Sequence, residues 1–188
     1  MTEPALAIDD LRQQPQLAQH VIDRIWRAWW QPKGHAISVI HDAVQRNLIS
    51  LAPTPFCLVA HRAGQFLGTV SLIACDLPDR AELTPWVAAL WVEPGVRNSG
   101  VATALLDACT AQAAISGERC IYLHCRHHLQ PFYEQRGWNV FVLNAHDDGM
   151  HILAKTLSFP SAVGRHTYSV RTFTKLKRNP GGSSTNSV

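Results

Sequence analysis

Residues 90–106 read Leu90-Trp-Val-Glu-Pro-Gly-Val-Arg97-Asn-Ser-Gly100-Val-Ala102-Thr-Ala-Leu-Leu106. The pattern predicts a buried strand that runs into a tight loop, and the loop opens a long helix. The first backbone N–H groups of a helix lack intrahelical partners, and the helix dipole adds partial positive charge there. Gly100 lets a diphosphate approach the main chain, and Arg97 adds a full positive charge. The stretch is therefore a candidate site for a phosphate-bearing ligand.

Two other phosphate-binding motifs are absent. No Gly-Lys-Ser or Gly-Lys-Thr triplet follows the loop, which excludes a P-loop. The Gly-x-Gly-x-x-Gly fingerprint of dinucleotide-binding folds is also missing. The loop at 93–100 is therefore the candidate phosphate-binding site in this sequence.

The flanking sequence predicts alternating helices and strands. Apolar residues recur at three- and four-residue spacing before a break at 31–34, and two apolar runs flank the hairpin turn Arg62-Ala63-Gly64. The polar stretch 76–82 predicts a loop, and the apolar run 86–92 predicts a strand covered on both faces. The expected order α-α-β-β-β-α-β-α-β-β indicates an α/β fold. The expected helices are 11–30, 38–48 (capped by Ser38), 100–116 and 129–135, and the expected strands are 56–61, 65–74, 86–92, 121–125, 138–143 and 151–157.

Three segments stand in a recognisable order. They are Leu67-Gly-Thr-Val-Ser71, the loop from Leu90 to Ala102, and Pro131-Phe-Tyr-Glu-Gln-Arg-Gly-Trp138. Together they resemble the early strand, the motif A loop (Arg-x-x-Gly-x-Ala) and the Phe-Tyr-Glu-x-Leu-Gly-Trp signature of the GNAT superfamily of acetyl-CoA-dependent N-acetyltransferases. The resemblance covers about residues 10–157, with Arg136 where Leu is usual. It implies the GNAT acyl-CoA N-acyltransferase fold, a central mixed, mostly antiparallel sheet flanked by helices.

The resemblance also implies how acetyl-CoA is bound. Main-chain groups of the strand would pair with the pantetheine amides like an added strand, and amides of the loop would hold the pyrophosphate. The thioester carbonyl would lie near the Val92 backbone, whose N–H could stabilise the oxyanion. The implied cofactor-binding residues are Leu90, Trp91, Val92, Arg97, Asn98, Ser99, Gly100, Val101 and Ala102.

Tyr133 is the candidate catalytic residue. The resemblance places it where a tyrosine hydroxyl protonates the departing coenzyme A thiolate. A phenol with a pKa of about 10 suits a thiol leaving group near about 8 to 9 as a general acid. The alternative interpretation is a core aromatic residue on an amphipathic helix.

The general base has no single candidate. Many relatives carry Glu eleven residues before the signature Arg, and here that position is Trp86. Glu93, Glu82 and Asp79 are near in sequence, and a solvated loop residue is the alternative for Glu93. The acidic loop with Asp76, Asp79 and Glu82 could also meet a cationic substrate amine, and a solvated loop is the alternative that we favour there. A water chain that removes the ammonium proton is the interpretation we favour. His124 or His127 lining the acceptor cleft is a further hypothesis.

Composition and the absence of long apolar runs indicate where the protein is located. The chain has 188 residues, 46% of them hydrophobic, and a formal net charge of +3. No signal peptide and no membrane-length apolar run is evident, which predicts a soluble, cytoplasmic protein.

The 5 cysteines form no Cys-x-x-Cys pair and are interpreted as buried free thiols. The histidines lack zinc-like spacing, so no metal is expected. The tryptophans at 26, 29 and 30 read mostly as core.

The sequence thus predicts a GNAT N-acetyltransferase domain over 1–157 and a C-terminal extension over 158–188. The extension includes a candidate strand at 167–174 and a polar tail. We expect direct attack of a small-molecule or peptide amine on the thioester in a ternary complex, without nucleic acid or membrane, and a homodimer. A non-catalytic acyl-CoA-binding or sensing module is the alternative that Trp86 keeps open. A nucleic-acid-binding protein that uses the basic residues from Arg165 to Arg178 is the third hypothesis.

Overall fold

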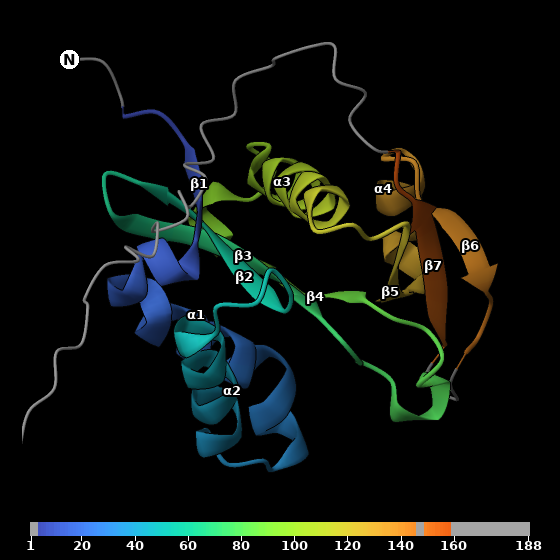
Figure 1. The fold of residues 1–188 in the computed structure, drawn as a ribbon, viewed down its shortest axis with the longest axis horizontal. Coiled ribbons are helices and arrows are strands. Elements are labelled where there is room, and N and C mark those ends of the chain that lie inside the picture. Colours follow the sequence, from blue (N-terminus) through green and yellow to red (C-terminus); the bar gives the residue numbers. More distant parts are fainter. Residues whose placement is uncertain (1–3, 146–148, 159–188) are drawn as a thin grey trace, which may run out of the picture.

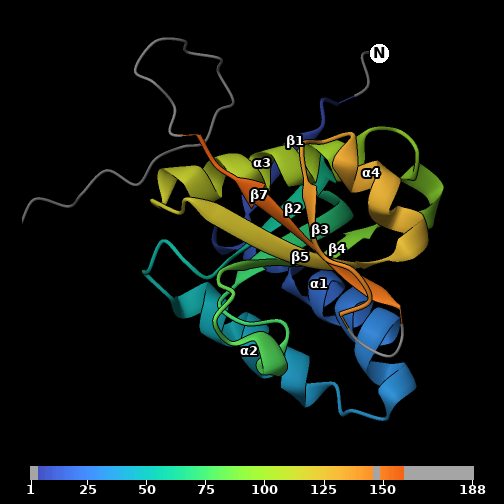
Figure 2. The same ribbon diagram turned by 90° about the vertical axis from the view of Figure 1, so that its right-hand side faces the viewer.

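The computed structural model describes residues 4–145 and 149–158 and contains one mixed sheet. Seven strands lie in the order β1-β2-β3-β4-β5-β7-β6, and the β4–β5 pair is parallel while the others are antiparallel. Helices α1 and α2 cover one face, and α3 and α4 cover the other (Figure 1 and Figure 2). This confirms the predicted fold. The strands are β1 Ala7–Asp10, β2 Phe56–Arg62, β3 Gln65–Ile73, β4 Trp86–Val92, β5 Cys120–Arg126, β6 Asn139–Val142 and β7 Met150–Thr156, and the helices are α1 Ala18–Ile25, α2 Ser38–Ile49, α3 Val101–Ile115 and α4 Gln130–Glu134.

The sheet separates two main apolar clusters. Side chains of α3 and α4 pack on one face, where Leu105 and Leu123 are fully or almost fully buried. On the other face α1 and α2 bury Val21 and Val44 against β2. A third cluster lies under the loop between β3 and β4, around the fully buried Trp86. Because successive strand residues point to opposite faces, each central strand contributes to both layers.

Strand β4 carries a bulge that separates it from β5. Its register with β3 shifts between the pairs Thr69–Trp91 and Ser71–Ala88, and Ala89 has a positive φ of 55°. Such a bulge bends a strand and increases its twist. In the described part of the chain, β4 and β5 pair in register only at Trp86 and Tyr122. We call the unpaired facing edges beyond this pair, residues 87–92 and 123–126, the fork.

The structure changes several expectations at the N-terminus. Residues 7–10 form β1, which was not predicted, and it pairs with β2. The single predicted helix 11–30 is instead two 3₁₀ turns, then α1, then a π-helical turn at 26–30. Pro15 begins the second 3₁₀ turn, where its missing N–H is tolerated. Ser38 does not cap α2, because Ile37 holds the cap position and no side chain bonds there.

Burial also differs from expectation at several positions. None of the tryptophans at 26, 29 and 30 is fully buried, and Trp29 is 40% exposed. Only the first two residues of β4 are buried, whereas a strand covered on both faces was predicted. Cys75 is exposed and Cys120 is half-buried, so the prediction of buried thiols is wrong for these two. The predicted C-terminal extension lies outside the described residues after Ser158.

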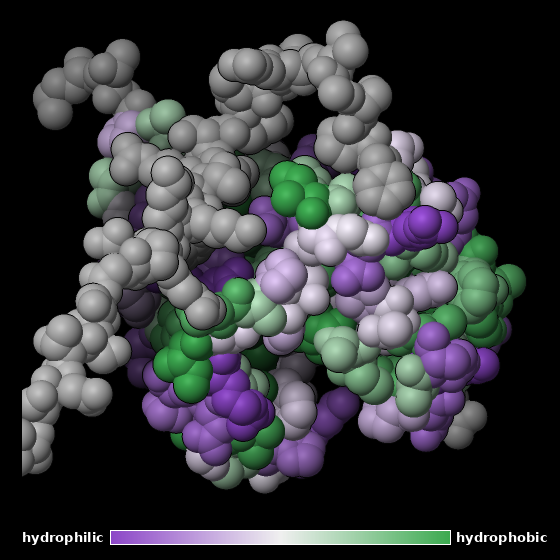
Figure 3. Space-filling model, in the orientation of Figure 1, coloured by the Kyte–Doolittle hydropathy of each residue, from purple (hydrophilic) through white to green (hydrophobic). Residues whose placement is uncertain are grey.

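Strand β6 forms an edge of the sheet. Phe141 and Leu143 are 54% and 60% exposed at this edge, and Figure 3 shows apolar residues gathered there. The ring of Phe141 lies edge-on to Tyr122, with ring centroids 5.7 Å apart.

Candidate functional site

The loop after β4 leaves the start of α3 open. Gly100 is the residue before α3, with φ of 87°, and a Cβ placed there would meet no heavy atom within 4 Å. Asn98 also has positive φ, and the Ser99 hydroxyl donates to the Val96 carbonyl over 2.6 Å. No side chain of the described residues caps α3. Its first N–H groups are therefore available to an anion, as the sequence predicts.

Arg97 lies between the loop and the fork. Its Nε donates to the Val92 carbonyl over 3.1 Å, and its guanidinium lies 5.1 Å from the ring centroid of Trp91. The side chain stacks on an aromatic face as well as donating, which a guanidinium does more readily than an ammonium. A positive charge thus stands at the entrance of the fork.

The backbone of β4 presents to the fork groups that pair with neither β3 nor β5, although the Val92 carbonyl accepts from Arg97. The Glu93 N–H donates to the Leu67 carbonyl of β3 over 2.9 Å. Because backbone groups alternate in direction along an antiparallel strand, those of Val92 point to the other side, toward the fork. The side chains of Leu90 and Val92 pack on the α3 face, whereas Trp91 packs on the α1 face. An extended ligand could pair with this edge.

Tyr133 lies on α4 beside the same fork. Its ring packs edge-on against Phe132 and Trp138, with centroids 5.1 and 6.3 Å away, and only 9% of the residue is exposed. Burial raises the pKa of the Tyr133 phenol, and the neighbouring Cys125 thiol adds to the rise. The hydroxyl is therefore held protonated, the state that a general acid needs. Tyr133 is part of the core, as the alternative interpretation has it, and its role as a general acid stays a prediction.

Arg136 replaces the usual Leu of the signature and has a structural partner. Its guanidinium donates to the Thr103 hydroxyl, from Nε over 3.1 Å and from Nη2 over 2.8 Å. It also donates to the Phe132 carbonyl over 2.6 Å. The side chain thus ties the helix that carries Tyr133 to the first turn of α3.

Trp86 fills the position where relatives have an acid. Its side chain is fully buried, and its Nε1 donates to the Leu83 carbonyl over 2.5 Å. Leu77 and Leu83 are buried against it. Trp86 therefore holds the loop that follows β3 on the sheet and supplies no acid–base group.

The loop fixed by Trp86 brings a carboxylate to β5. Asp76 Oδ2 lies 2.7 Å from His124 Nε2, and both side chains are 25% exposed. The His124 ring stands edge-on to Trp86, with centroids 6.2 Å apart. Its Nδ1 is buried and has no hydrogen-bond partner among the described residues. The sequence analysis named Asp76 and His124 separately, because no sequence spacing predicts a contact between a loop residue and a residue of a later strand.

Of the other candidate groups, Glu93 and His127 have structural partners, and Asp79 and Glu82 are exposed. Glu93 pairs with Arg24 of α1, with both side chains partly buried, so it is not a solvated residue. His127 packs edge-on against His151, with ring centroids 5.1 Å apart. Asp79 is exposed, as is Glu82. These contacts place none of them in the fork.

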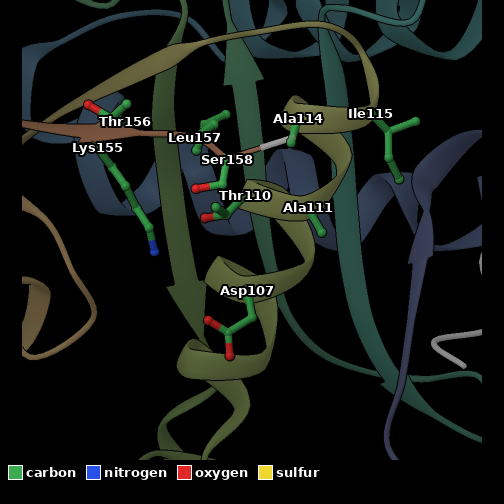
Figure 4. A pocket seen from close by; sticks show the side chains of 9 residues that line it. All are labelled: Asp107, Thr110, Ala111, Ala114, Ile115, Lys155, Thr156, Leu157 and Ser158. Carbon is green, nitrogen blue, oxygen red and sulfur yellow. The ribbon is translucent and has the colours of Figure 1, made fainter. Parts of the chain in front are cut away.

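A separate cavity lies at the far end of α3. It has a volume of about 430 Å³ and is bounded by the second half of α3 and the end of β7 (Figure 4). Its polar side chains include Asp107, Thr110 and Lys155. It contains none of the predicted site residues. In the described ranges, no cluster of three or more His, Cys, Asp or Glu residues could hold a metal ion.

Comparisons with known proteins agree on one family. The model of the acetyltransferase (GNAT) family matches residues 20–138. A structure of aminoglycoside 6'-N-acetyltransferase complexed with coenzyme A is 19% identical, with a TM-score of 0.62, and the match covers 79% of this chain and 96% of that one. Aminoglycoside 6'-acetyltransferase type Ii is 22% identical, with a TM-score of 0.60 and the same coverage.

A third match is a GNAT-family acetyltransferase from Streptococcus pneumoniae, at 15% identity and a TM-score of 0.61. That match covers 82% of this chain and 100% of the other. No curated protein sequence matches this chain. No helix in the described ranges has the length and hydropathy needed to cross a bilayer.

Proposed function

Because this chain belongs to the GNAT family of acetyltransferases, we propose that it transfers the acetyl group of acetyl-CoA to a primary amine. The family establishes acetyl transfer in general. The observation that supports a coenzyme A donor is the juxtaposition of an uncapped α3 start, at Gly100, with the unpaired edge of β4. A phosphate-bearing, amide-bearing extended ligand matches both features at once.

The residues present fit that donor. The loop amides from Arg97 to Ala102 would hold the pyrophosphate, because they open a helix whose first N–H groups lack partners. The backbone of Leu90, Trp91 and Val92 would pair with the pantetheine amides at the fork. Arg97 would exchange its contact with the Val92 carbonyl for the phosphates.

The transfer itself would use two groups of this chain, the Val92 N–H and the Tyr133 hydroxyl. A neutral amine attacks the carbonyl carbon, and the Val92 N–H donates to the developing oxyanion. As the C–N bond forms and the C–S bond breaks, the thiolate takes the proton of the Tyr133 hydroxyl. The nitrogen loses its surplus proton to water as the amide forms, and Tyr133 recovers a proton from solvent. No cysteine lies on the loop or the helix start, so direct attack in a ternary complex is favoured over an acetyl-cysteine.

The acceptor is proposed only by class. Two similar structures are aminoglycoside acetyltransferases, and they support a small-molecule amine as the acceptor. A peptide amine stays an open prediction, as does a cytoplasmic location. The homodimer also stays a prediction, which sedimentation velocity tests.

One alternative function has a specific observation behind it. Trp86 occupies the acid position and is fully buried, so β4 supplies no base. A non-catalytic module that binds or senses an acyl-CoA would have the same loop and fork. It would bind the coenzyme and turn over no amine.

Calorimetric titration of acetyl-CoA tests the binding site. Gly100→Glu puts bulk and negative charge where the pyrophosphate would lie and should abolish binding. Gly117→Glu is the matched control, because Gly117 ends α3 with a φ of 93° and also has open space around it. Both variants carry the same backbone strain, so retained binding in Gly117→Glu with loss in Gly100→Glu supports the site. If the wild-type protein does not bind acetyl-CoA, the proposed binding site is wrong.

A further inference from the structure

The fork has its proton donor on one face and an unused acid–base pair on the other. In β5, Leu123 and Cys125 point to the face of α3 and α4, where Tyr133 packs. His124 points to the opposite face, because strand residues alternate. The loop proposed to hold the pyrophosphate opens α3, so the coenzyme would occupy the α3 face of the sheet. The amine therefore arrives on the face of His124 if the thiolate leaves toward Tyr133.

The position of His124 along β5 also fits this role. Tyr122 makes the register pair with Trp86 of β4. His124 is the next residue on the same face, so it lies where the two strands have begun to separate. Its Nδ1 is buried and its Nε2 contacts Asp76, so a proton reaches the pair through the Asp76 carboxylate, whose side chain is 25% exposed. The residue thus stands at the base of the fork, on the acceptor face.

Asp76 belongs to this pair through the packing of its loop. Leu77, its neighbour in sequence, is 8% exposed and packs in the cluster around Trp86. The bond from Trp86 Nε1 to the Leu83 carbonyl fixes the other end of the same loop. This anchoring holds the carboxylate 2.7 Å from His124 Nε2. A solvated loop, the alternative for this acidic segment, does not describe Asp76.

We propose that Asp76 and His124 together accept the proton of the acceptor ammonium, in place of the carboxylate that relatives carry at the position of Trp86. This inference rests on the proposed function. The ammonium N–H bond breaks, the proton passes directly or through one water to the Asp76 carboxylate, and Asp76 passes it on to Nε2 of the neutral imidazole, whose positive charge the carboxylate then stabilises. The electron pair left on nitrogen forms the C–N bond. The pair returns its proton to solvent after product release.

The residues packed around His124 make the Asp76–His124 pair the acid–base group on the face of the sheet opposite α3. Trp86 from β4 and Ile152, the register partner from β7, carry no charge. On β5 itself, a hydrogen bond with Cys120 raises the pKa of the Tyr122 phenol, so it stays neutral near neutral pH. By the same alternation, the exposed Arg126 lies on this face two residues beyond His124, and Asp76 is the carboxylate that contacts His124.

The test is the pH dependence of turnover, with an amine that the wild type accepts from a panel. His124→Gln and Asp76→Asn should lower kcat/KM by about 10²-fold near pH 7, the low end of general base catalysis. The loss should shrink as pH rises toward the pKa of the amine, near about 10.4 for a lysine-like group. At that pH the free amine needs no base. Acetyl-CoA affinity should not change.

Matched controls come from the same two segments. Asp79→Asn alters an exposed carboxylate of the same loop, and His127→Gln alters an exposed imidazole just after β5. Both should retain wild-type profiles. His124→Ala should regain activity when millimolar imidazole is added, which a structural role does not explain.

Four outcomes decide the inference. Wild-type-like activity in His124→Gln overturns it and leaves the proposed function intact. An equal loss at every pH without imidazole rescue also overturns it, because His124 then only supports the structure. No turnover of any amine by the wild type contradicts the proposed function and this inference together. A pH-dependent loss with rescue supports both.

Discussion

The guanidinium of Arg136 and the hydroxyl of Thr103 join the end of α4 to the first turn of α3 through two hydrogen bonds, of 3.1 and 2.8 Å. The guanidinium also lies 3.8 Å from the ring centroid of Phe132. Thr103 follows the pyrophosphate loop directly, and Tyr133 is on α4. This contact therefore couples the proposed phosphate site to the proposed general acid.

Replacing Arg136 by Met should loosen this coupling. We expect the free energy of unfolding to fall by about 1–3 kcal/mol, since hydrogen bonds of a charged, partly buried group are lost. We also expect kcat to fall more than acetyl-CoA affinity, because Tyr133 loses its position. Urea denaturation and steady-state kinetics measure the two effects. Arg119→Met, at an exposed arginine, is the control. An unchanged kcat contradicts the coupling.

Replacing Tyr133 by Phe should remove the general acid with little effect on binding. We expect kcat to fall by about 10²-fold while calorimetric affinity for acetyl-CoA stays within experimental error. In the wild type the phenol must be protonated to act, and burial raises its pKa. The alkaline loss of kcat should therefore begin above about pH 10, the usual phenol range. An unchanged kcat in Tyr133→Phe contradicts the assignment, and an alkaline loss that starts well below this range and that Tyr133→Phe removes contradicts the raised pKa.

Replacing Gly68 by Ala should disturb the fork from the β3 side. A Cβ at Gly68 would lie 2.6 Å from the Trp91 carbonyl and 3.1 Å from Leu105, so β4 must move. We expect weaker acetyl-CoA binding and a free energy of unfolding lowered by about 1–3 kcal/mol, as for overpacking. Gly95→Ala is the matched control, because nothing lies within 4 Å of a Cβ there. Equal affinity in both variants would show that the β3–β4 spacing does not position the donor.

The thiols should label in an order set by burial. Cys75 is exposed and should react first with a maleimide at pH 7.5. Burial raises the pKa of the Cys125 thiol to about 11 and raises that of Cys109 as well. Little reactive thiolate then exists at either residue in the folded protein. Mass spectrometry of digested protein measures the order, and rapid labelling of Cys109 without denaturant contradicts the described core.

The strongest predictions came from local signals. The Arg97–Ala102 loop, its glycine with positive φ and the long helix after it are a contiguous pattern, and a helix start has the same free N–H groups in any fold. The hairpin at Gly64 likewise depends on neighbouring residues. These elements are correct because nothing distant alters them.

The sequence predictions failed where contacts between residues distant in sequence determine the structure. Strand β1 exists because Ala7–Asp10 pairs with β2, some fifty residues away in sequence, as in the pair Ala7–His61. The bulge at Ala89 leaves no signal in an apolar run, yet it opens the fork. The Asp76–His124 pair needs both Trp86 and the loop to be in place. Tertiary packing sets each of these, and periodicity does not report it.

The central claim is that this chain moves an acetyl group from acetyl-CoA to a primary amine. The most direct measurement is incubation with acetyl-CoA and a panel of aminoglycosides, polyamines, amino acids and peptides, followed by mass spectrometry of the amine and quantification of free coenzyme A thiol. The account predicts one acetylated amine for each thiol released, at a rate reduced in Tyr133→Phe. Tight binding of acetyl-CoA with no acetylated amine from any member of the panel would contradict it and favour the binding module.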